Sequence, residues 1–391
     1  MFCFKNIERL RFHTILLTLT LQMHTMDDLI FKIAISLIPG IGSVTARNLI
    51  AYIGSVEGVF LEKEKNLLKI PGIGEINAQR IINQNVTDDA KREIEFIQKN
   101  NIQTYFYLDE NYPTRLKSCP DAPIILYYKG NANINETRII SVVGTRNATN
   151  YGKEACDEMI KGFSESKYRI VVISGLAYGI DVQAHKSCLK YNVPTIGVLA
   201  HGLDIIYPSL HAPVAKKMME NGGLISDFPS GTRIDRQNFL RRNRIIAGMA
   251  DATIVVESAE KGGALVTADI ANSYNRDVFA FPGRSSDVYS RGCNKLIKLN
   301  EAVLIEGHSD IEKAMNWDIK TSSVKAVQTS LFVELTSEEQ KLVDLLKNGD
   351  HFIDEIMLET KLPMSKVSAI LLELEFKGIV ASLPGKMYRL K

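Results

Sequence analysis

The chain contains few cysteines, and no two of them form a C-x-x-C pair. Its five cysteines are odd in number and widely spaced, at Cys3, Cys119, Cys156, Cys188 and Cys293. This pattern indicates reduced thiols and argues against both a disulfide framework and a zinc site. The seven histidines show no ligand spacing either. We therefore expect no bound metal.

Nucleotide-binding signatures and an excess of one charge are also missing. The sequence has no G-x-x-x-x-G-K-[ST] run and no three-glycine dinucleotide fingerprint, so neither ATP nor NAD is expected and we predict no cofactor. Lysine and arginine number 47 against 45 aspartates and glutamates, for a net charge of +2. Because this total does not indicate a polyanion partner, a nucleic-acid function must rest on where the arginines cluster.

The start of the chain carries a short apolar run, ILLTLTL at 15–21, behind Lys5, Arg9 and Arg11. The run resembles a signal peptide but is too short to span a bilayer, and no small-residue cleavage site follows it. The stretch that begins at Met26 reads as a natural domain start. We interpret residues 1–25 as an artefact of start-codon choice or a disordered lead-in, and we expect no membrane association.

A length of 391 residues with 45% hydrophobic content predicts two or three globular domains. The first is marked by an internal repeat, LIPGIGSVTARNLIAYIG at 37–54 and KIPGIGEINAQRIIN at 69–83. Two Pro-Gly-Ile-Gly turns, each followed by a helical run, predict an all-α helix-hairpin-helix (SAM-like) domain over 26–103. Such turns can present backbone N–H groups to a phosphate. A packing module that contacts no ligand is an equally good interpretation.

A second domain is predicted over 104–316, where short β-branched runs alternate with helical stretches. The runs begin at RIISVVG (138–144) and YRIVVISG (168–175), and continue with 193–200, 222–228, 251–259, 277–283 and 301–307. Near-continuous apolar strands of this kind predict an α/β, Rossmann-like parallel sheet covered on both faces. Ligands of such sheets bind beyond the carboxyl ends of the strands.

The last part of the chain reads as a polar linker at 317–335 and a winged-helix domain at 336–391. Thr336 and Glu339 form a predicted capping box. A later helix carries Val367, Ile370, Leu371 and Leu374 at helical spacing. The lysines of that helix are balanced by glutamates, which favours protein contact or packing over DNA reading.

Glycine-rich loops follow several of the predicted strands. They include GTRNATNYG at 144–152, SGLAYGID at 174–181 and EKGGALVTADIA at 260–271. One such loop is weak support, because glycine commonly just closes a βα turn. Several at one sheet edge predict an anion-accepting rim. Its candidate residues are Gly144, Arg146, Ser174, Gly175, Gly179, Gly262 and Gly263.

The most charged stretch is TRIDRQNFLRRNRIIAG at 232–248, with five arginines against one aspartate. Guanidinium groups can hold phosphates while an aromatic ring stacks on an unpaired base, as single-strand sites require. Alternatively, Phe239 begins a core-facing helix whose other face the arginines solvate. The candidate binding residues are Arg236, Phe239, Arg241, Arg242, Asn243 and Arg244.

Six motifs, VVGTRNATNYG, VISGLAYGIDVQAHK, GLDIIYP, NFLRRNRIIAG, GGALVTADIA and FPG, occur in the order and spacing of the DNA-processing protein A (DprA/Smf) family. The chain resembles that family over roughly residues 27–391. The resemblance implies a cytoplasmic, non-enzymatic, single-stranded-DNA-binding protein that protects incoming DNA during natural transformation and loads the RecA recombinase. It also implies homodimers built through the Rossmann-like domain, a phosphate pocket at the rim residues and a basic segment at 236–244. Gln237 and Asn238 depart from the family pattern, where histidine or proline often appears.

The alternative is an enzyme. The GGALVT stretch is similar to the Gly-Gly-x-Gly-Thr loop of lysine-decarboxylase-like phosphoribohydrolases, which cleave nucleoside monophosphates. Those enzymes follow the threonine with a catalytic glutamate, whereas Ala268 and Asp269 follow Thr267 here. The acid needed at the glycosidic bond is therefore not placed. We interpret His185 as a hydrogen-bonded packing residue and not as a catalyst.

Overall fold

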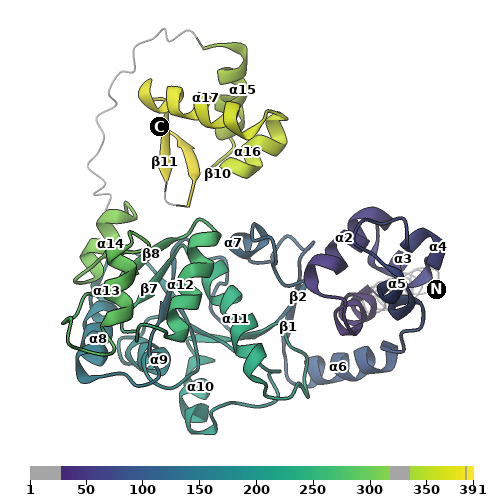
Figure 1. Ribbon diagram of the computed structural model, residues 1–391, viewed down its shortest axis with the longest axis horizontal. Coiled ribbons are helices and arrows are strands. Elements are labelled where there is room, and N and C mark those ends of the chain that lie inside the picture. Colours follow the sequence, from purple (N-terminus) through teal and green to yellow (C-terminus); the bar gives the residue numbers. More distant parts are fainter. Residues whose placement is uncertain (1–27, 318–334, 384) are drawn as a thin grey trace, which may run out of the picture. The chain divides into compact units, whose positions relative to one another are not determined.

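The structure is a computed structural model that describes residues 28–317, 335–383 and 385–391. The predicted lead-in at 1–25 and nearly all of the predicted linker lie outside the described residues. The chain divides into two compact units, and each is described by itself below; Figure 1 labels their helices and strands. The first runs through Asn135 and includes Ile196–Ile245; the second comprises Glu136–Thr195 and Ile246–Lys391. The domain boundaries drawn from the sequence stay a prediction.

A nine-stranded sheet contains all seven strands that the sequence predicts. In spatial order it runs β1 (Gln103–Phe106), β2 (Ile125–Gly130), β6 (Gly222–Ser226), β5 (Thr195–Val198), β4 (Val171–Gly175), β3 (Ile139–Val143), β7 (Ala252–Val255), β8 (Asp277–Ala280) and β9 (Val303–Leu304). Strand β3 pairs in parallel with β4 and β7, and β8 pairs in parallel with β7 and β9. The Rossmann-like fold is confirmed.

Two strands were not predicted, and they make the sheet mixed. Strand β1 pairs antiparallel with β2, and β2 pairs antiparallel with β6. The residues of β2 from Ile125 to Tyr128 are all buried, so this strand lacks the alternation of a half-exposed strand. A short apolar run of this kind does not by itself reveal its type or its partner.

The first unit carries the predicted helix-hairpin-helix fold in α2 (Ser43–Ile53), α3 (Val56–Leu61), α4 (Glu64–Leu67) and α5 (Glu75–Ile82). Gly42 and Gly74 are the N-caps of α2 and α5. The turns before them need glycine at Gly40 and Gly72, whose φ angles are 80° and 83°. The unit also contains α6 (Thr87–Lys99), α7 (Thr114–Lys117), α10 (Ala212–Met218) and most of α11 (Arg236–Gly248).

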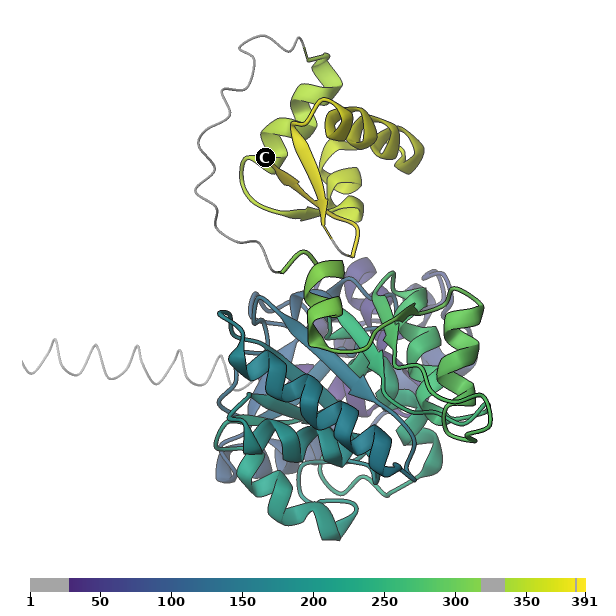
Figure 2. The same cartoon turned by 90° about the vertical axis from the view of Figure 1, so that its left-hand side faces the viewer.

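The second unit covers both faces of its strands with helices. Helices α8 (Asn150–Glu165), α9 (Ile180–Lys190) and α14 (His308–Ala314) share a buried core with β3, β4 and β7. Helix α8, in blue-teal, lies in front of the strands in Figure 2. Helix α12 (Gly263–Ser273) packs against β7 and β8, and α13 (Arg291–Lys298) packs against β8. This layering leaves the carboxyl ends of the strands to the connecting loops.

The C-terminal residues form the predicted winged helix. Its elements are α15 (Ser337–Leu346), β10 (His351–Phe352), α16 (Ile353–Thr360), α17 (Met364–Phe376), β11 (Val380–Leu383) and β12 (Met387–Leu390). Thr336 and Glu339 make the predicted capping box, and the four predicted apolar residues of α17 are buried. Lys366 of α17 and Lys377, the C-cap residue of that helix, form ion pairs with Glu338 and Glu339 respectively. Among the described helices, none is both long and apolar enough to cross a bilayer.

Candidate nucleic-acid interface

The loop after β3 carries Arg146 at the sheet edge, and hydrogen bonds to Glu257 hold this loop in place. Arg146 is exposed, whereas the Glu257 side chain, just after β7, is 2% exposed. The Glu257 carboxylate accepts hydrogen bonds from the Thr149 amide at 2.9 Å and from the Thr149 hydroxyl at 2.6 Å. The Thr145 amide donates to the Glu257 carbonyl at 2.7 Å. Hydrogen bonds to a buried carboxylate are strong, so Arg146 extends from a rigid loop.

Gly179, between β4 and α9, is packed directly against the loop that carries Arg146. Its φ angle is 80°, and a Cβ there would lie 2.0 Å from the Thr145 carbonyl oxygen and 2.7 Å from Arg146 Cα. The Ile180 amide donates to the same Thr145 carbonyl at 3.1 Å. Only glycine combines this backbone conformation with so close an approach. The structure therefore brings together two of the predicted glycine loops.

Ser174 and Gly175 shape the edge of the sheet and do not face solvent. The Ser174 hydroxyl is fully buried and donates to the Val142 carbonyl at 2.6 Å. The Gly175 carbonyl lies 2.7 Å from His185 Nε2, and His185 Nδ1 lies 2.7 Å from the Thr195 hydroxyl. The prediction that His185 is a packing residue is confirmed.

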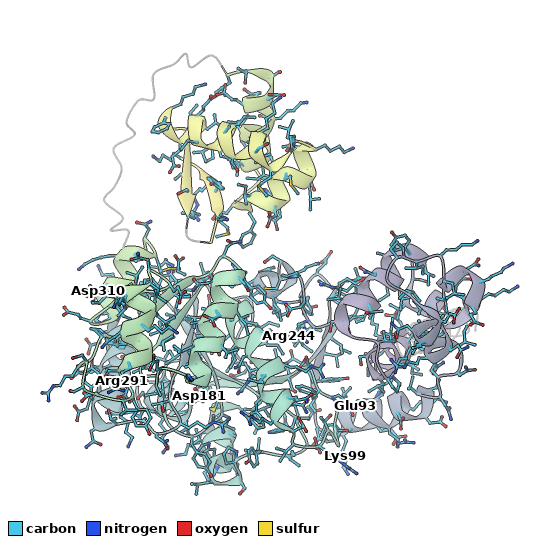
Figure 3. The ribbon with its side chains drawn as sticks, viewed as in Figure 1. Glu93, Lys99, Asp181, Arg244, Arg291 and Asp310 are labelled. Atoms are coloured by element: carbon cyan, nitrogen blue, oxygen red, sulfur yellow. The ribbon has the colours of Figure 1, made fainter. Side chains whose placement is uncertain are left out.

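The N-terminus of α12 is an open part of the rim that could accept an anion. Gly263 is exposed, and a Cβ added to it would meet nothing within 4 Å. The amides of Gly263 and Ala264 have no acceptor among the described residues, and the first turn of α12 has no acidic residue. Helix α9 differs, because Asp181 lies in its first turn (Figure 3). Unpaired amides and an uncompensated helix dipole favour a bound anion.

The arginine segment is defined here as residues 236–244 of α11. Two of its arginines form hydrogen bonds with other groups of the protein. Arg242 is 5% exposed and donates to the Val198 carbonyl. Arg244 donates to the Asp121 carbonyl and pairs with Asp227 at 2.7 Å, with 12% of its side chain exposed. Arg236 and Arg241 are exposed, and Asn243 is half-buried. The exposed positions are therefore the ones that can meet a ligand directly.

Phe239 is half-buried, in contact with a second aromatic ring. Its ring centroid lies 5.9 Å from that of Tyr207 at an interplanar angle of 61°, and Tyr207 is itself 44% exposed. The Arg241 guanidinium lies 5.3 Å from the centroid of the Phe228 ring. Edge-to-face pairs of this type hold rings in fixed orientations. The pair could therefore offer a preformed aromatic surface to a base.

Two residues of this site, Glu257 and Tyr178, were not among those predicted from the sequence. Tyr178 directly precedes Gly179 and is 47% exposed, which makes it a further base-stacking candidate. The position of this tyrosine within a glycine loop could have indicated base stacking from the sequence alone. The sequence indicates the role of Glu257 only weakly, through a single acidic residue that follows an apolar strand.

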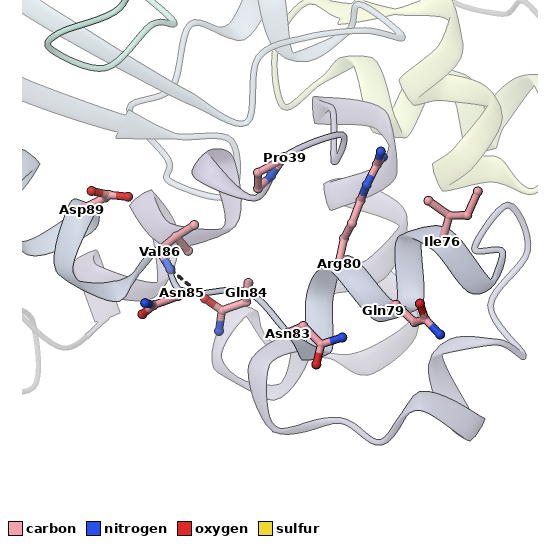
Figure 4. Close-up of a pocket in the computed structure, with 9 residues that line it drawn as sticks. All are labelled: Pro39, Ile76, Gln79, Arg80, Asn83, Gln84, Asn85, Val86 and Asp89. Carbon is pink, nitrogen blue, oxygen red and sulfur yellow. Dashed lines mark hydrogen bonds between the residues drawn. The ribbon is translucent and has the colours of Figure 1, made fainter.

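The helix-hairpin-helix fold contains a separate open groove of about 590 Å³ (Figure 4). Arg80 and Asp89 are the charged residues among those that line it. Arg80 lies so close to the first hairpin turn that a Cβ on Gly40 would lie 2.0 Å from its guanidinium. Because the groove offers one charge of each sign, it does not favour a polyanion. Whether the hairpins bind phosphate or only pack stays a prediction.

Fold and rim together define a Rossmann-like protein with an anion-accepting sheet edge, joined to helix-hairpin-helix and winged-helix parts. Residues 103–316 match the family described as DNA recombination-mediator protein A. Residues 331–386 match the DprA winged helix domain, and residues 31–84 match the SAM-like helix-hairpin-helix tandem. The chain belongs to the DNA recombination-mediator protein A (DprA/Smf) family.

Relatives and solved structures agree with this assignment. Protein Smf of Synechocystis is 31% identical, over 92% of this chain and 98% of its own length. The X-ray structure of DNA processing protein A from Streptococcus pneumoniae matches with a TM-score of 0.64 and 28% identity, over 73% of this chain and 97% of that one. A structure of the Helicobacter pylori protein, titled for its single-stranded DNA binding mode, matches with a TM-score of 0.50 and 26% identity, over 56% of this chain and 96% of that one.

Proposed function

We propose that this protein binds single-stranded DNA, with strand phosphates at the N-terminus of α12 and at Arg146. The observation that carries the proposal is an exposed arginine on a rigid loop, at the same sheet edge as unpaired helix amides. The strand β3 that leads to Arg146 pairs in parallel with β7, which precedes α12, so their carboxyl ends share one edge. The similarity to the Helicobacter pylori protein, whose structure is described for its single-stranded DNA binding mode, supports the same ligand.

Further contacts are proposed at the predicted residues of the arginine segment. Arg236 and Arg241 would meet phosphates, and Phe239 with Tyr207 would meet a base. We propose that Arg242 and Arg244 support the site from within the protein and do not contact DNA. Their guanidinium groups donate hydrogen bonds to backbone carbonyls and to Asp227. Backbone contacts and stacking carry little sequence information, so binding should be nearly sequence-blind.

The test is a titration of the full chain into a fluorescent oligothymidine at two salt concentrations, with a matched duplex as competitor. Phosphate contacts predict affinity that falls steeply with salt. A stacking site predicts that the duplex competes poorly, because its bases are paired. Absence of binding at low salt would refute the proposal and make nucleotide hydrolysis the next assay.

We propose that the protein acts by binding and not by nucleotide hydrolysis. Thr267, in the stretch similar to the phosphoribohydrolase loop, is 2% exposed. The Glu257 carboxylate near the same edge is buried and accepts two hydrogen bonds from Thr149. A general acid must reach the glycosidic oxygen, and this carboxylate faces inward. Release of a free base from nucleoside monophosphates by the purified protein would contradict this proposal.

Homodimerisation through the Rossmann-like domain is also proposed. Strand β9 is an edge strand in which Val303 is 57% exposed and Leu304 is 47% exposed. An apolar edge of this kind can pair with a second copy. Sedimentation of the full chain should show a dimer, and Val303→Lys should shift it toward monomer. A wild-type monomer at micromolar concentration would contradict the proposal.

We also propose the specific role that the family implies. In the cytoplasm, the protein protects incoming DNA and loads the RecA recombinase. The assay is RecA assembly on single strands coated with a single-strand-binding protein, followed as the lag before RecA hydrolyses ATP. The protein should shorten the lag, and an Arg146→Ala variant should do so less. An unchanged lag at saturating protein would remove RecA loading from the proposal and leave the binding activity intact.

A further inference from the structure

Glu93 is a buried carboxylate that joins the helical part of the first unit to the loop before α11. It lies on α6 and is 5% exposed, and Figure 3 labels it. Its two carboxylate oxygens lie 3.1 and 3.0 Å from the Ser230 amide nitrogen, which donates to them. The Ser230 hydroxyl donates to the same carboxylate. Both donors of one loop residue thus depend on a side chain that is 137 positions away in the sequence.

The loop that contains Ser230 leads directly into the arginine segment. A second carboxylate, that of Asp204, accepts from the Gly231 amide at 3.1 Å. Gly231 has a φ angle of 73°, so the chain turns sharply there. The Thr232 hydroxyl donates to the Pro229 carbonyl at 2.7 Å. The turn therefore sets the direction in which the chain enters α11, four residues before Arg236.

Stability alone does not explain a carboxylate in this position. No described lysine or arginine forms an ion pair with Glu93, and Asp204 adds repulsion. Burial raises the pKa of Glu93, although the hydrogen bonds from Ser230 act in the opposite direction. A buried charge without a counter-ion costs free energy even when it is hydrogen-bonded. What the carboxylate adds is a fixed position for two donors of the loop.

We propose that Glu93 is a positioning residue for single-strand binding, through which the helical part of the chain holds the loop at 229–235 and thereby aims Arg236 and Arg241. This inference rests on the proposed function and assigns part of it to a residue that does not touch DNA. It gives α6 a role in binding that does not require the hairpins to contact a phosphate.

Three variants of the full chain test the proposal. Glu93→Leu removes both acceptors, and we expect about fivefold weaker oligothymidine binding, the order of one lost hydrogen bond. Glu93→Gln keeps one oxygen that can accept from Ser230, so it should restore most of the affinity. Glu95→Leu changes an exposed glutamate of the same helix and should bind like wild type. The Ser230 amide provides a local readout, because hydrogen exchange there should accelerate in Glu93→Leu alone.

The outcomes separate this proposal from the function on which it rests. If wild type and Arg241→Ala bind equally, the arginine segment is not a binding element and the proposed function fails at that point. A different result is that Arg241→Ala binds DNA more weakly, whereas Glu93→Leu binds like wild type although hydrogen exchange at Ser230 accelerates. The contact between Glu93 and Ser230 would then exist without positioning the arginines. That result would overturn the inference alone. Equal exchange at Ser230 in wild type and Glu93→Leu would overturn it as well.

Discussion

The rim around Arg146 and the arginine segment of α11 show two opposite ways of arranging charge. The rim has one exposed arginine, supported by a buried carboxylate, Glu257, and open helix amides. The arginine segment has four arginines, of which Arg242 and Arg244 bind the protein's own carbonyls and Asp227. The comparison teaches that the number of cations in a stretch of sequence is a poor measure of the charge offered to a ligand.

Buried arginines in the second region serve the fold. A guanidinium with 5% exposure must have its donors satisfied inside the protein, because an unpaired buried donor is costly. Arg242 donates from one of its terminal guanidinium nitrogens to the Val198 carbonyl, at the end of β5. The rim differs, because it combines the backbone amides at the start of α12 with the exposed side chain of Arg146.

The strongest test of the comparison concerns the rim glycines. Gly179→Ala places a Cβ against the Thr145 carbonyl at a positive φ, so we expect a loss of about 2–4 kcal/mol in the free energy of unfolding. Gly263→Ala meets no neighbour within 4 Å, so its stability should be unchanged or slightly higher. Urea unfolding measures both. A wild-type midpoint in Gly179→Ala would show that the two loops are not locked together.

The next largest effect is expected for Arg146→Ala, which should weaken oligothymidine binding about tenfold and lower the salt slope by about one. The matched control is Arg169→Ala, an exposed arginine before β4 at the opposite end of the strands, 3.9 Å from Glu136. The control should bind like wild type. Equal weakening in both variants would indicate a general charge effect and not a site at the rim.

Two single substitutions of neighbouring arginines in α11, Arg241→Ala and Arg242→Ala, extend the comparison. Arg242→Ala leaves the Val198 carbonyl without its donor, so it should lower the free energy of unfolding by about 1–3 kcal/mol. Arg241→Ala should leave stability within about 0.5 kcal/mol of wild type and weaken DNA binding severalfold. Thermal melts and titrations on the same samples decide the matter. The reverse pattern would mean that exposure does not identify the binding arginines.

The smallest effect is expected from pH, through His201 in the first unit. Burial lowers the pKa of His201, and the nearby Arg242 acts in the same direction. The unfolded chain therefore binds the proton more tightly, and stability should fall as pH drops through about 6.5. Melting temperatures of wild type and His201→Gln between pH 7.5 and 5.5 should converge as the pH falls. Parallel curves would show that His201 does not contribute.

Several features could be predicted from local sequence because local physics decides them. The glycine turns before α2 and α5, the capping box at Thr336 and the apolar strands of the parallel sheet each depend on residues close together in the chain. The rim followed from these, since parallel strands place their carboxyl ends at one edge. The strands β1 and β2 were not predicted. Strand β2 pairs antiparallel with β6, more than 90 residues later, and β1 joins the sheet only through β2.

The sequence by itself therefore determined the family, the order of the elements and the residues near the sheet edge. Only the tertiary structure decided which of those residues face outward. Arg241 and Arg242 are neighbours of the same type, yet one is exposed and the other lies under the surface against β5. The roles of Glu93 and Glu257 depend on Ser230 and Thr149, which are more than 100 positions away. Burial and long-range hydrogen bonds arise only when distant segments meet, and no local pattern encodes them.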